Sequence, residues 1–243
     1  MPISERSFAD RHQKAVNLLA ALPLMSPPYS PADATLGLAT FTTFVASVAT
    51  ANAAVGTTNT TFTDATNQRA VNTKTIQERC TQIVSYVKSN TAWKLNFPRI
   101  KQLADKVRGI KPPRKVVAPP APQPGQPTPA PVKPRDRGDG SYADIAVNYR
   151  ALVTAVVALD TYAPTAPNLT AVALAALATA LEADNAAVAG AEQGLDGAQR
   201  KRFALYYDEP GGLHVKFQAT KSAVKGQYGS KSPQWSAVKS MRW

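Results

Sequence analysis

The sequence predicts an all-α protein made of two internally duplicated antiparallel helical bundles joined by a Pro-rich linker. Three observations predict this fold. The chain matches itself at an offset of about 133 residues, 10 of its 20 prolines fall within residues 111–140, and apolar residues elsewhere recur at helical spacing. We therefore expect helical repeat 1 at 1–110, the linker at 111–140 and helical repeat 2 at 141–243.

The duplication is visible in short matches that run in the same order through both halves. Ser-Phe-Ala-Asp at 7–10 recurs as Ser-Tyr-Ala-Asp at 141–144, and Asn-Ala-Ala-Val at 52–55 recurs at 185–188. An insertion of four residues near 208–211 then lengthens the offset. Single positions that also align are Tyr29 with Tyr162, Leu36 with Leu169, Arg69 with Arg202, Val87 with Val224, and Ile100 with Val238.

Four helices are expected in each repeat, the second of them long. The expected helices cover 7–22, 33–72, a third starting near Ile76, and 98–109 in repeat 1, and 143–160, 166–205, a third starting near Leu213, and 233–241 in repeat 2. Apolar residues spaced by seven predict a bundle seam on each long helix. The seam residues are Phe41, Val48, Val55 and Phe62 in repeat 1, and Leu174, Leu181, Val188 and Leu195 in repeat 2.

Residues 111–140 are predicted to be extended. Proline lacks an amide donor and fixes φ, which favours polyproline II over an ordinary helix. At about 3.1 Å per residue, the stretch from the first to the last of these prolines, 112–134, spans on the order of 70 Å. We expect a semi-rigid spacer that lets the two repeats pair with each other or reach a neighbouring molecule.

The residues that carry enzyme chemistry are sparse, so we expect no enzyme activity. The single cysteine, Cys80, falls on an apolar helical stripe, and the two histidines, His12 and His214, lie on different helices. No metal-ligand spacing and no phosphate-binding glycine loop is present in the sequence. We accordingly predict no cofactor, no metal and no small-molecule substrate.

Positive charge is concentrated in the C-terminal third of each repeat, where aromatic residues are interleaved with it. The chain has a net charge of +12, and a basic surface attracts anionic polymers. The candidate contacts with a polyanion or another partner are Lys88, Lys94, Arg99, Lys101, Lys106, Arg108 and Trp93 in repeat 1, and Lys221, Lys225, Lys231, Lys239, Arg242 and Trp243 in repeat 2. Alternatively, the aromatic residues fill the end of each bundle and the lysines simply solvate it.

No charged residue lies between Ala34 and Thr63, a stretch long enough to span a bilayer. Its many Thr, Ser and Asn residues, and the acidic Glu182 and Asp184 in the matching stretch, favour a tightly packed bundle over membrane insertion. The N-terminal apolar run matches a mid-chain helix, so it is not taken as an export signal. We expect a cytoplasmic protein by default, with export by an unrecognised route left open.

Two functions remain. The first is a non-enzymatic structural protein that self-associates as a homo-oligomer or polymer, such as a filament, tube or coat. It is favoured by the heptad seams and by the opposite charges of the 141–199 region, with one basic and six acidic residues, and the basic ends. The alternative is a protein that binds nucleic acid or another polyanion through the basic third of each repeat.

Overall fold

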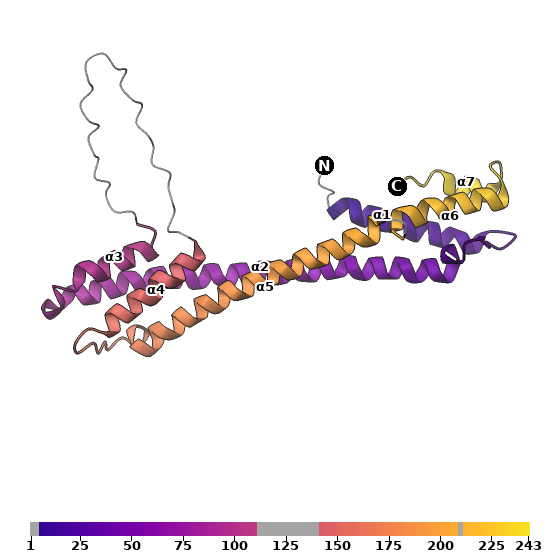
Figure 1. Cartoon of the computed structure of the whole chain (residues 1–243). Helices are drawn as coiled ribbons and strands as arrows, with labels where there is room; N and C mark the ends of the chain where they lie inside the picture. Colours follow the sequence, from indigo (N-terminus) through magenta and orange to yellow (C-terminus); the bar gives the residue numbers. More distant parts are fainter. Residues whose placement is uncertain (1–4, 111–140, 209–210) are drawn as a thin grey trace, which may run out of the picture. The chain divides into compact units, whose positions relative to one another are not determined.

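The computed structural model describes residues 5–110, 141–208 and 211–243 (Figure 1). Every regular element in these ranges is helical, which confirms the predicted all-α class. The longer helices are α1 (Glu5–Ala21), α2 (Leu38–Ser89), α3 (Phe97–Val107), α4 (Tyr142–Val157), α5 (Ala171–Tyr207), α6 (Leu213–Tyr228) and α7 (Pro233–Lys239). The predicted linker, 111–140, lies outside the described residues.

Local sequence signals explain where several helices begin and end. The Ser141 hydroxyl accepts a hydrogen bond from the backbone amide of Asp144 at 3.1 Å, and the Asp144 carboxylate accepts one from the Ser141 amide at 3.3 Å. This reciprocal capping box starts α4. At the start of α7, the Ser232 hydroxyl accepts a hydrogen bond from the Trp235 backbone amide. Gly229, at φ 85°, ends α6.

One expected helix boundary in repeat 1 is absent. The second and third helices form a single helix, α2, of 52 residues, because nothing between them stops it. Residues 72–76 contain neither Pro nor Gly, and the Thr73 hydroxyl bonds the Arg69 carbonyl at 2.8 Å within the helix. In repeat 2 the equivalent region contains Pro210 and two glycines, and there the helix does break, between α5 and α6.

The described chain forms two compact units that divide it differently from the expected repeats. The first unit combines Met1–Asp64 with Ala189–Trp243, and the second unit is Ala65–Val188. Each unit therefore takes residues from both predicted repeats. The long helices α2 and α5 each contribute one part to the first unit and one part to the second.

The core of the first unit is built from α1, the start of α2, the end of α5, α6 and α7. Its largest fully buried side chains include Leu18, Phe41 and Phe217, with the Tyr206 ring at the centre. The Tyr206 hydroxyl donates to the Phe8 carbonyl at 2.8 Å and accepts from the Asn52 amide at 2.9 Å. A buried hydroxyl with two partners orients this ring and ties α5 to α1 and α2.

The core of the second unit is built from the end of α2, α3, α4 and the start of α5. Helices α3 and α4 lie side by side in this unit (Figure 1). Each of the four helices contributes buried residues to this core, among them Ile83, Ile100, Leu152 and Leu174. Cys80 is also buried here, and desolvation raises the pKa of its thiol to about 12, which makes it a packing residue as expected.

Candidate functional site

The candidate basic residues of the second unit lie at the end of α2, on α3 and in the connection between them. Ile100, Ala104 and Val107 bury one face of α3, so its cations are directed to the opposite face. Lys88, Lys94, Arg99, Lys101 and Lys106 are exposed, and Arg108 is half-buried. The second unit therefore places these six residues on α2 and α3 and on the chain directly beside these two helices.

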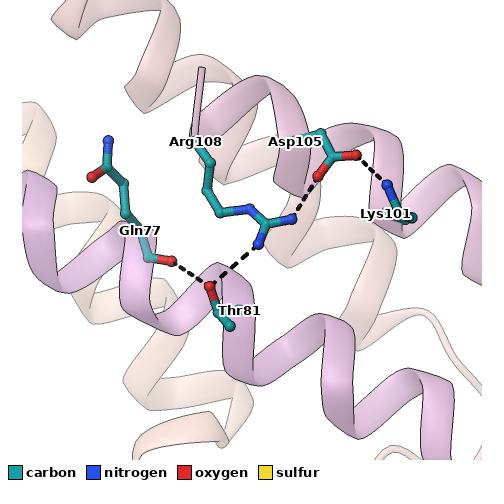
Figure 2. Close-up of polar contacts among 5 residues, drawn as sticks. All are labelled: Gln77, Thr81, Lys101, Asp105 and Arg108. Atoms are coloured by element: carbon teal, nitrogen blue, oxygen red, sulfur yellow. Dashed lines mark hydrogen bonds and ion pairs between the residues drawn. The ribbon is translucent and has the colours of Figure 1, made fainter. Parts of the chain in front are cut away.

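Two of these six cations are occupied within the chain. Figure 2 shows Asp105 between Lys101 and Arg108: its carboxylate accepts from the Lys101 ammonium at 2.6 Å and from the Arg108 guanidinium at 2.5 Å. A second Arg108 nitrogen reaches the Thr81 hydroxyl at 3.3 Å, which links α3 to α2. Desolvation raises the pKa of Asp105, but the hydrogen bonds from Lys101 and Arg108 outweigh it and leave the pKa below its ordinary value. The single Asp105 carboxylate offsets one of these two positive charges, so the Lys101–Asp105–Arg108 cluster keeps a net charge of +1.

Trp93, a candidate base-stacking residue, belongs to the core. Its side chain is 3% exposed, and its Nε1–H donates to the Asp160 carbonyl at 2.9 Å. The indole packs against the Tyr86 and Tyr162 rings, at centroid distances of 5.6 and 6.2 Å. The Trp93 ring is thus packed inside the second unit, although the residue was named among the candidate contacts with a partner.

In the first unit, Lys221 also serves the fold. Its ammonium donates to the Lys239 carbonyl at 3.1 Å and to the Met241 carbonyl at 2.6 Å, at the C-terminal end of α7. A cation at this end complements the helix dipole. Burial lowers the pKa of Lys221. Lys225, Lys231, Lys239 and Arg242 are exposed, and the Lys225 ammonium lies 5.8 Å from the Trp235 ring centroid.

Trp243 is half-buried and packed on three sides. Its ring lies 5.4 Å from Phe217 and 5.3 Å from His214 between centroids, and the Arg11 guanidinium lies 5.6 Å from it. These contacts hold the C-terminal residues against α1 and α6. Trp243, like Trp93, is a packing residue.

Four of the eight predicted seam residues belong to the cores of the units: Phe41 and Val48 in the first, Leu174 and Leu181 in the second. Phe41, Val48, Val55, Leu174, Leu181 and Val188 are buried, and Phe62 and Leu195 are half-buried. A charge at Val48 or Leu181 is therefore expected to unfold a unit and does not report on contacts between copies.

An open apolar groove of about 630 Å³, which was not among the predicted sites, lies between α4 and α5 in the second unit. Its lining is mainly Val153, Val157, Ala171, Val172, Ala175 and Ala178. Val172 is 80% exposed and Val157 is 43% exposed. The apolar spacing 153–157 on α4 and 171–175–178 on α5 is the signal that would have located it.

In their most apolar stretches the long helices bury the large side chains, such as Phe41, Val48 and Leu181, and expose mainly Ala and Thr. Both α2 and α5 are long and apolar enough to cross a membrane by length and composition alone, which is weak evidence for a span. The buried share of the apolar 18-residue window is 28% in α2 and 22% in α5. The threonines of α2 add to this surface, because hydroxyls such as those of Thr42, Thr50 and Thr61 donate to backbone carbonyls four residues earlier.

Within the described ranges, no group of three or more His, Cys, Asp or Glu residues could hold a metal ion. No family model matches this chain, and no curated protein or solved structure matches it either.

Proposed function

We propose that this chain is a non-enzymatic structural protein that associates with copies of itself into a larger assembly. The observation that carries the proposal is the exposure of the apolar windows of α2 and α5, of which less than a third is buried. Large contiguous apolar surfaces on soluble proteins mark interaction sites, because leaving them in water is unfavourable. A second copy of the chain is the occupant that we propose.

The α4–α5 groove is the part of this surface that is best suited to pack against a neighbouring copy. Its one charged lining residue, Arg150, is held in a bidentate ion pair with Glu182, with both nitrogen–oxygen distances at 2.6 Å. The groove is thus apolar inside and electrically balanced at its rim. Such a surface does not select a charged partner, and it matches the uncharged stretches of another copy, residues 38–63 of α2 or 171–181 of α5.

A lipid bilayer is a less suitable cover for the same helices. Glu182 and Asp184 lie on α5, where Asp184 accepts from the Asn72 amide at 2.6 Å. Carboxylates and their polar partners are expensive to place in the hydrocarbon region. Contact with another protein chain leaves these groups at a hydrated rim.

We also propose that the chain is internally duplicated, with two bundles of antiparallel helices and the Pro-rich linker. This duplication belongs to the proposed function. It is supported by burial at aligned positions of the two repeats, for example Leu36 and Leu169, or Val87 and Val224. Two equivalent units on one chain offer the assembly two equivalent contact surfaces. Repeated contacts of this kind generate rings or open polymers.

The experiment that tests self-association places a charge in the groove. Val172→Glu is expected to reduce the mass of the assembly measured by light scattering, with helicity unchanged. Val147→Glu is the matched control, because Val147 is also an exposed valine, at 70%, and lies outside the groove lining. An assembly mass that is the same in both variants and in the parent chain would reject the groove as the contact surface.

Polyanion binding is the second candidate, favoured by the exposed cations of the second unit. Within the described residues, Lys88, Lys94, Arg99 and Lys106 make no ion pair. Lys94→Glu is expected to weaken nucleic-acid binding and to lower its salt dependence by at least about one counterion. Lys74→Glu, an exposed lysine of α2 outside this group, is the control.

A further inference from the structure

The contacts that hold each unit together join the two halves of the chain, residues 5–110 and 141–243. In the first unit, the Ser30 amide donates to the Gln227 side chain at 2.9 Å, and the Tyr228 hydroxyl donates to the Pro27 carbonyl at 2.6 Å. In the second unit, Trp93 bonds Asp160 across the same division. Neither half completes a described core by itself.

The two halves also use equivalent positions for this mutual burial. The sequence offsets align buried residues with buried residues along most of both halves. The aligned buried pairs are Leu18 and Leu152, Leu22 and Val156, Met25 and Leu159, Phe41 and Leu174, Val48 and Leu181, Ile76 and Leu213, Cys80 and Phe217, and Ile100 and Val238. Each unit is therefore an N-terminal part of one repeat completed by the C-terminal part of the other.

We propose that the same surfaces pair two copies of the chain by reciprocal exchange of halves. The 5–110 half of one copy would be completed by the 141–243 half of a second copy, with every contact described above retained. Exchange of identical elements is a low-cost route to association because it requires no new interface. Within one chain, pairing is favoured by the high effective concentration of the tethered halves, so exchange is expected to increase with protein concentration.

This inference deepens the proposed function, since it names one surface through which copies associate, and it is tested by crosslinking across the Ser30–Gln227 contact. One tagged copy carries Ser30→Cys and a second, differently tagged copy carries Gln227→Cys. Both are co-expressed and treated with a short bismaleimide. Cys80 stays in place, because it is buried and its thiol pKa is raised to about 12. The wild-type chain is treated in parallel to confirm that it does not react.

The expected result is a covalent product of twice the chain mass that carries both tags. A chain with both cysteines is the control, and it should link within itself. If the control links and the mixed pair does not, exchange is overturned; if the control itself does not link, the assigned contact is wrong and the inference falls with it. Light scattering on the same samples separates the claims: assembly without a mixed product rejects exchange alone, whereas a single-chain mass throughout rejects self-association.

Discussion

The guanidinium carbon of Arg69 lies 3.9 Å from the ring centroid of Tyr142, so that a cation from one half of the chain stacks on an aromatic ring from the other. The aligned residues in the first unit repeat the arrangement, with Arg202 lying 4.1 Å from the Phe8 ring. Both arginines are on the long helices, and both rings are at the start of the first helix of a repeat. The two contacts thus lie at positions that the predicted duplication aligns.

The Arg69–Tyr142 contact is expected to contribute measurably to the stability of the second unit. A double-mutant cycle with Arg69→Met and Tyr142→Leu should give a coupling energy of about 0.5–1 kcal/mol, the range for a partly exposed cation–π pair. Urea unfolding followed by circular dichroism measures it. Additive effects of the two substitutions would show that the stacking contributes nothing.

Leu181 is fully buried in the second unit, and its truncation tests the described core directly. Leu181→Ala is expected to lower the free energy of unfolding by about 2–5 kcal/mol, because it removes buried apolar contacts and leaves a cavity. Leu95→Ala is the matched control: Leu95 is 93% exposed, and its truncation should change stability by less than about 0.5 kcal/mol. Equal effects would contradict the burial of Leu181.

Trp93→Phe is expected to separate folding from polyanion binding. The substitution removes the Nε1–H donor and leaves the Asp160 carbonyl without it, which should lower the free energy of unfolding by about 1–2 kcal/mol. Nucleic-acid affinity measured by fluorescence anisotropy, on protein verified as folded, should not change. A loss of affinity at unchanged stability would instead show that the Trp93 ring contacts the nucleic acid.

Asp105 should make the second unit sensitive to acid. Because its folded-state pKa is held below the ordinary value of about 3.9, its stabilising effect is complete above that pH and is lost as pH falls through the lower, folded pKa. Asp105→Asn should therefore be less stable than the parent by about 1 kcal/mol at pH 7, and the difference should narrow as the pH falls below the ordinary pKa of an aspartate. Thermal unfolding against pH measures this.

The control for Asp105 is Asp64→Asn, which changes an exposed aspartate outside the Lys101–Arg108 cluster. Because the Asp64 side chain is exposed, this substitution should change the free energy of unfolding by less than about 0.5 kcal/mol. A difference for Asp105→Asn that does not narrow on acidification would show that the two ion pairs do not stabilise the fold.

Apolar spacing in the sequence identified the buried faces but not the segments that cover them. The seven-residue spacing within each seam predicted that Val48 and Leu181 face away from solvent, because periodicity specifies one face of a helix. Both side chains are buried. It cannot specify that Tyr206, from the other half, contacts Asn52 beside that face. That information depends on tertiary packing between segments far apart in the chain.

Charge counting likewise located the cations without showing which are occupied. Lys221 and Lys225 look alike in sequence, yet the first is bonded to two carbonyls at the end of α7 and the second is exposed. The apolar groove at Val172 was not predicted, because the buried and exposed faces of an alanine-rich helix differ little in hydropathy. Which of these faces is exposed depends on where the neighbouring helix lies in the fold.

The most direct test of the central claim is size-exclusion chromatography of the full chain with light scattering and a 260/280 nm absorbance ratio, at low and high salt. We predict a species well above the 25.8 kDa of one chain, with a protein-like absorbance ratio. It should persist at high salt, because apolar contacts are not screened, whereas phosphate contacts weaken steeply. A mass of one chain at every concentration and salt would contradict self-association, and a small species with 260 nm absorbance that is lost at high salt would instead indicate nucleic-acid binding.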